Sequence, residues 1–71
     1  MFFKHNRNLP PMKYYKGQEV YFNYFGDKLQ GIIEILDYGG SVENKYHSYD
    51  IYVDTVKTLY KHIPESDISE L

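Results

Sequence analysis

The sequence of 71 residues contains no cysteine and no tryptophan, few prolines and few glycines, and no long apolar run. Without cysteine, disulfides and thiolate metal sites are excluded. No stretch approaches the length of a transmembrane span, and no apolar run follows the basic N-terminus as in a signal peptide. We therefore expect a cytoplasmic protein without a membrane contact, and one small domain with a thin core.

Catalytic signatures are equally sparse. No serine lies in a nucleophile-elbow pattern, and the glycines match no phosphate-binding or dinucleotide fingerprint. The histidines lack a recognised metal-ligand spacing. We expect no enzymatic activity, no cofactor and no metal site.

What the sequence does have is aromatic residues, with nine tyrosines and four phenylalanines. Tyrosine is frequent in strands and at interfaces, because its ring packs while its hydroxyl stays hydrated. Strand tyrosines without a shared role are the simplest explanation; a surface that contacts a partner is the alternative.

Charge divides the chain at residue 16. Residues 1–16 contain four cations and no acid, whereas residues 17–71 contain four lysines and ten acids. Prolines and asparagines interrupt any regular pattern in residues 1–16, so we expect an extended basic arm there. The arm can fold back onto the acidic body or reach a phosphate backbone, and its apolar Phe2, Phe3, Leu9 and Met12 can dock on the body.

From residue 17 onward, short strands alternate with turn signals, as in a small all-β barrel. We predict strands over 19–25, 29–36, 49–54, 58–63 and 68–71, with one 3₁₀ turn over 64–67 and no helix. In the first strand, Val20 and Phe22 share one face; in the third, Ile51 and Val53 do so. Gly31 marks a sharp bend in the second strand.

These segments carry a family likeness. Four motifs follow one another in the order that resembles the Tudor-like and Agenet-like SH3-type barrels. They are Gly17-x-x-Val20-x-Phe22, Leu29-Gln30-Gly31-Ile32-Ile33, the run from Tyr49 to Asp54, and the closing Ile63-Pro64-Glu65-Ser66-Asp67-Ile68. The resemblance covers residues 17–71 and implies a five-stranded SH3-like (Tudor-like) barrel that binds rather than catalyses. Three of the four positions at which many eukaryotic relatives place a methyl-lysine cage are aliphatic here.

The resulting hypothesis is a protein-binding module that uses an aromatic face and acidic loops, and whose partner is basic. The abundance of Lys, Asn, Ile and Tyr is typical of AT-rich bacterial or phage genomes, so a small accessory or immunity-type protein fits. The residues expected to form the partner-binding face are Tyr21, Tyr24, Phe25, Tyr49, Tyr52 and Tyr60.

The alternative is nucleic-acid binding, in which exposed tyrosines stack on bases and the arm contacts phosphates. The arm residues for this role are Lys4, Arg7, Lys13 and Lys16. Open edge strands of such a fold can also pair between copies, which would give a homodimer.

Overall fold

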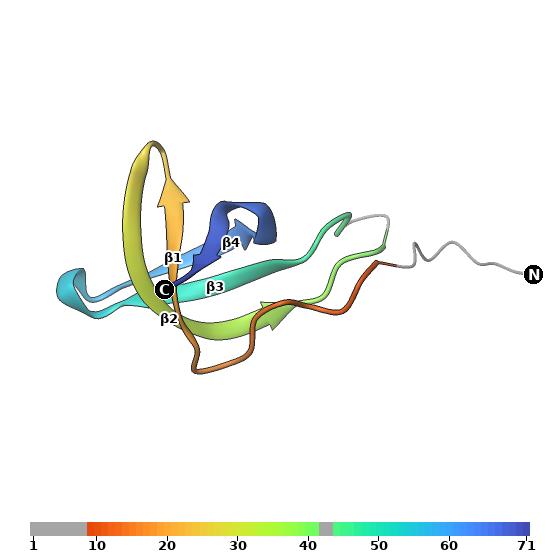
Figure 1. The fold of residues 1–71 in the computed structure, drawn as a ribbon, viewed down its shortest axis with the longest axis horizontal. Coiled ribbons are helices and arrows are strands. Elements are labelled where there is room, and N and C mark those ends of the chain that lie inside the picture. Colours follow the sequence, from red (N-terminus) through yellow and green to blue (C-terminus); the bar gives the residue numbers. More distant parts are fainter. Residues whose placement is uncertain (1–8, 42–43) are drawn as a thin grey trace, which may run out of the picture.

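The computed structural model describes residues 9–41 and 44–71, whose five strands form one antiparallel sheet (Figure 1). The predicted all-β class is confirmed. The strands are β1 (Glu19–Tyr24), β2 (Asp27–Asp37), β3 (Ser48–Val53), β4 (Thr58–Pro64) and β5 (Ile68–Glu70). Their order is β4-β3-β2-β1-β5, so the sheet is open, with β4 and β5 at its edges.

Two 3₁₀ turns connect the last strands, where the sequence predicted one. The predicted turn is η2 (Glu65–Asp67), and the additional turn is η1 (Asp54–Val56) between β3 and β4. Lys57 closes η1 in the left-handed region, with φ of 52°. Because the chain coils through η1 instead of making a simple four-residue turn, the third strand ends one residue earlier than predicted. In the described ranges, no helix is long and apolar enough to cross a membrane.

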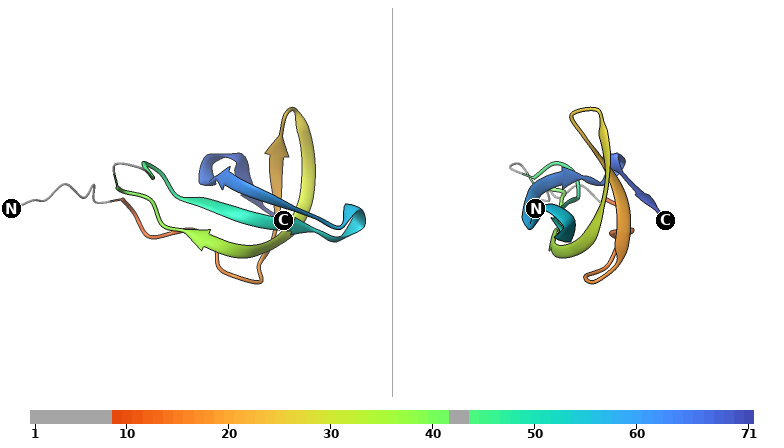
Figure 2. Two further views of the ribbon diagram at one scale, coloured as in Figure 1. Left: turned by 180° about the vertical axis from the view of Figure 1, so that it is seen from behind. Right: turned by 90° about the vertical axis from the view of Figure 1, so that its left-hand side faces the viewer.

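β2 is the longest strand and bends strongly along its length, as the predicted bend at Gly31 requires (Figure 2). Its first half pairs with β1, and its second half pairs with β3. A Cβ atom at Gly31 would lie 2.6 Å from the carbonyl oxygen of Tyr52 and 2.7 Å from Cγ2 of Ile51. The bend therefore brings β3 so close to β2 that only glycine fits.

Replacing Gly31 by alanine should consequently destabilise the protein by about 1–3 kcal/mol, the usual cost of overpacking a well-packed site. Urea denaturation measures this cost. The neighbouring Gln30→Ala variant, at an exposed position, is the control and should change stability by less than about 0.5 kcal/mol. Equal stability of Gly31→Ala and the wild type would contradict the close approach of the two strands.

The hydrophobic core lies inside the curve of the sheet. Val20 and Phe22 are buried there as predicted, together with Ile51 and Val53. The other buried hydrophobic residues are Tyr14, Ile33, Tyr49, Ile63 and Ile68. The core thus takes one tyrosine from the N-terminal segment and one from β3.

Candidate functional site

Three of the predicted aromatic residues come together at the tip of the β1–β2 hairpin. Tyr24, at the end of β1, packs edge-on against both Phe25 and Tyr60, with ring centroids 4.7 Å apart in each pair. Tyr60 comes from β4, which is not a neighbour of β1 in the sheet. The curvature of β2 therefore assembles this aromatic cluster (Tyr24, Phe25 and Tyr60) from two distant strands.

The cluster is anchored on one side and open on the other. Tyr60 also packs against the buried ring of Phe22, with centroids 5.5 Å apart, which joins the cluster to the core. Phe25 is 90% exposed. An aromatic ring has few rotatable bonds, so an exposed one provides contact area at low entropic cost.

Phe25 occupies an unfavourable backbone conformation. It and Gly26 form the two-residue turn between β1 and β2, with φ of 48° and 87°. Positive φ at both central residues is the type I′ pattern, which prefers Asn-Gly or Asp-Gly. A bulky side chain in the left-handed region costs about 1–2 kcal/mol. Phe25 thus combines backbone strain with almost complete exposure, a combination that stability alone does not favour.

The other three predicted residues lie elsewhere. Tyr49 is fully buried, so the prediction that its ring belongs to an exposed face is wrong. Tyr21 and Tyr52 are half-buried on the opposite face of the sheet. The Lys28 ammonium lies 4.6 Å from the centre of the Tyr21 ring, whereas Tyr52 stands between Ile32 and Leu59 on the flanking strands. The six residues therefore do not form one continuous face.

The basic arm is only partly within the described residues. Lys13 and Lys16 are exposed. Lys4 and Arg7, and the apolar Phe2 and Phe3, lie outside the described ranges. The described part, residues 9–16, runs along the body, where Met12 packs against the core as predicted and Tyr14 is buried in it. The one sequence signal for this docking is the two-residue spacing of Met12 and Tyr14, which places both side chains on the same side of an extended segment.

His47 joins the N-terminal segment to the loop that precedes β3. Its Nδ1 accepts a hydrogen bond of 2.9 Å from the Gly39 amide, so the proton sits on Nε2, which donates to the Pro10 carbonyl at 2.6 Å. The ring is buried and lies against Tyr38. Both nitrogens are therefore committed to backbone groups, a role that no pattern in the sequence indicated.

Glu65 is the second link to the N-terminal segment. Its Oε2 accepts hydrogen bonds from the Tyr49 hydroxyl at 2.5 Å and from the Lys13 amide at 3.0 Å. The Tyr49 hydroxyl also accepts one from the Tyr14 amide at 3.3 Å, and the Tyr14 hydroxyl donates to the Ile68 carbonyl. Tyr49 thus connects β3, η2 and the N-terminal segment from the centre of the core.

The two buried tyrosines have perturbed acidities. Burial raises the pKa of Tyr49 well above its ordinary value, and the hydrogen bond that it donates to Glu65 raises it further. Burial likewise raises the pKa of Tyr14, with the negative charges of Glu70 and Glu65 adding to the effect. Both hydroxyls therefore hold their protons more firmly in the folded chain than in the unfolded one.

From these shifts we predict a loss of stability in alkali. The unfolded tyrosines release protons near their ordinary pKa of about 10, while the folded protein keeps them. The stabilisation is therefore complete below about pH 10 and is lost as the pH rises toward the folded pKa values. Urea midpoints at about pH 8 and pH 11 test this; Tyr49→Phe, which removes one titrating hydroxyl, should show a smaller drop. An equal drop in both proteins would contradict the assignment.

A groove opens beside these links, with a volume of about 470 Å³. It runs between the N-terminal segment, the residues before β3 and the turn η2. Its walls are mainly apolar, and Glu65 supplies one carboxylate. The lining residues are Leu9, Pro10, Tyr46, His47, Pro64, Glu65 and Ser66.

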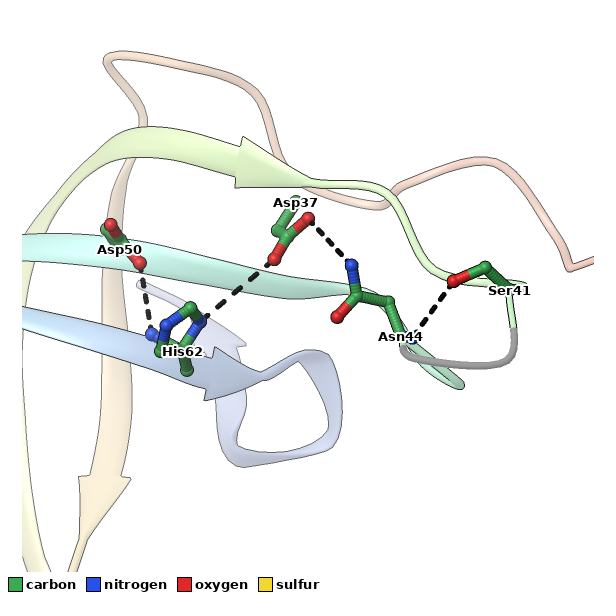
Figure 3. Close-up of polar contacts among 5 residues, drawn as sticks. All are labelled: Asp37, Ser41, Asn44, Asp50 and His62. Carbon is green, nitrogen blue, oxygen red and sulfur yellow. Dashed lines mark hydrogen bonds and ion pairs between the residues drawn. The ribbon is translucent and has the colours of Figure 1, made fainter.

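A polar network connects β2, the β2–β3 loop, β3 and β4 (Figure 3). Asp50 is buried and accepts a hydrogen bond of 3.0 Å from the backbone amide of His62. His62 has φ of 59° at the irregularity in the β3–β4 pairing, and Asp50 satisfies the amide freed there. Asp37 lies between His62 and Asn44 (Figure 3), 4.0 Å from the His62 ring nitrogen. Ser41 and Asp50 thus bind backbone amides, whereas Asp37 contacts the side chains of His62 and Asn44.

Within residues 9–41 and 44–71, no three His, Cys, Asp or Glu side chains gather as a metal ion requires. Comparison of the chain with protein-family models, curated proteins and solved structures finds no match.

Proposed function

We propose that this chain is a non-catalytic binding module that docks a protein partner through the aromatic cluster. The observation that carries the proposal is Phe25, which is 90% exposed and has φ of 48° at the hairpin tip. Asparagine or glycine would satisfy this turn without strain, so the phenylalanine has to be explained by what it contacts. A rigid aromatic anchor at a protein interface is the role that fits.

Acidic groups beside the cluster favour a basic partner. Asp27 begins β2 in the same hairpin, and Asp67 lies on η2, which packs against β1; both side chains are exposed. Residues 17–71 as a whole contain ten acids and four lysines. Complementary charge of this kind steers association and selects among partners.

The proposal includes the SH3-like, Tudor-like class and a cytoplasmic, bacterial or phage setting. The bent β2 shared between two halves of the sheet and the 3₁₀ turn before β5 support the SH3-like assignment. The predominance of lysine over arginine supports the setting.

Capture from a lysate with and without nuclease tests the class of partner. We expect a stoichiometric, basic protein that persists after nuclease treatment and at moderate salt. Recovery that disappears with nuclease and falls steeply with salt would instead indicate phosphate contacts by a basic arm. Recovery of this chain alone, with sedimentation at twice the monomer mass, would indicate that a second copy covers the cluster.

A further inference from the structure

We infer that the groove between the N-terminal segment and η2 is a second contact site, and that it takes an arginine side chain of the partner. The inference rests on the proposed function, because it names a side chain that the partner contributes. It concerns a different surface, built from Pro10, Tyr46, Pro64, Glu65 and Ser66 instead of the aromatic cluster.

The groove contains an unbalanced negative charge. Glu65 is half-buried, and within the described ranges no cationic side chain lies within 4 Å of its carboxylate. Its two partners, the Tyr49 hydroxyl and the Lys13 amide, are neutral donors, and both bind Oε2. A carboxylate withdrawn from water is stabilised by a cation, and the groove is where one can approach.

The walls of the groove favour arginine over lysine. Pro10 and Pro64 are apolar, and the ring of Tyr46 is 60% exposed with no described hydrogen bond to hold it. A guanidinium is planar and weakly hydrated, stacks on aromatic faces and binds carboxylates through two donors. Its aliphatic stem covers apolar surface while the charged end reaches the acid. Arginine fits a tyrosine-walled groove with one carboxylate better than the strongly hydrated ammonium of lysine does.

The test is an NMR titration of the full chain with a short blocked peptide that carries one arginine between glycines. The matched peptide has citrulline, a neutral analogue of similar shape, in place of arginine. We expect the arginine peptide to shift the amide signals of Tyr46, Glu65 and Ser66 with millimolar affinity, and the citrulline peptide to bind at least about tenfold more weakly.

Three variants locate the contact. Glu65→Gln keeps an oxygen acceptor for Tyr49 and Lys13 but removes the charge, so affinity should fall about tenfold. Glu19→Gln removes an exposed charge outside the groove and should leave the affinity unchanged. Phe25→Asn should also leave the affinity for the arginine peptide unchanged. A failure of the groove inference can therefore be distinguished from a failure of the proposal that the aromatic cluster binds the partner.

Equal shifts with both peptides, or the same affinity for Glu65→Gln and the wild type, would overturn the inference. The inference would also be overturned if the amide signals of the groove shifted with the arginine peptide only after Lys4 and Arg7 were changed to glutamine. That result would mean that the chain's own basic residues occupy the groove in place of a partner.

Discussion

Replacing Tyr49 by alanine is expected to unfold the protein. The side chain is fully buried and connects β3, η2 and the N-terminal segment through its hydroxyl. Truncating a large buried aromatic residue costs about 3–5 kcal/mol, and a domain of this size without a disulfide has about 3–5 kcal/mol in total. Circular dichroism and the NMR signal dispersion at 25 °C should both show loss of the folded state.

Two variants separate the packing of Tyr49 from its hydrogen bonds. Tyr49→Phe keeps the ring and should remain folded, with a loss of about 1–2 kcal/mol from the missing hydroxyl. Tyr46→Ala, at an exposed position three residues earlier, should change stability by less than about 0.5 kcal/mol. A folded Tyr49→Ala variant with a cooperative thermal transition near that of the wild type would contradict the central position of this ring.

Replacing Phe25 by asparagine is expected to separate stability from binding. Asparagine at the first central position of a type I′ turn, followed by glycine, is the preferred pair. The substitution relieves backbone strain but loses an edge-on contact with Tyr24 that covers little of the ring. We expect a net gain of about 0.5 kcal/mol, seen as a rise of a few degrees in Tm. Affinity for the partner should fall about 30-fold or more, as for an interface anchor worth at least 2 kcal/mol.

Tyr15→Ala is the matched control for Phe25. Tyr15 is 65% exposed and has no ring contact among the described residues, so its removal should alter neither Tm nor binding. A Phe25→Asn variant that binds as well as the wild type, or one that melts well below it, would show that Phe25 serves the fold.

The fold was largely predictable because its signals are local. Alternation in the first and third strands places Val20 and Ile51 in the core, and Gly31 marks the bend. The 3₁₀ conformation of η1 was not predictable, because Asp-Thr-Val-Lys contains neither proline nor glycine and Lys57 takes the left-handed conformation without a glycine.

The candidate site was only partly predictable, since it depends on contacts between distant segments. Tyr24 and Phe25 could be placed at a turn, but their contact with Tyr60 requires the curvature that brings β1 over β4. Tyr49 lies two positions before Ile51 on the same strand, so the two side chains share the core face. This alternation correctly indicates burial of Tyr49, whereas its position near a loop suggested exposure. The links through His47 and Glu65 pair residues more than 35 positions apart, and nothing local encodes them.

The most direct test of the account is the affinity of the captured partner for three proteins: wild type, Phe25→Asn and Tyr15→Ala. Isothermal titration calorimetry in nuclease-treated buffer would measure it, with Tm recorded for each protein. We expect Phe25→Asn to be at least as stable as the wild type and to bind at least about 30-fold more weakly, while Tyr15→Ala matches the wild type in both respects. Equal affinity for the wild type and Phe25→Asn would contradict the claim that the aromatic cluster is the binding site.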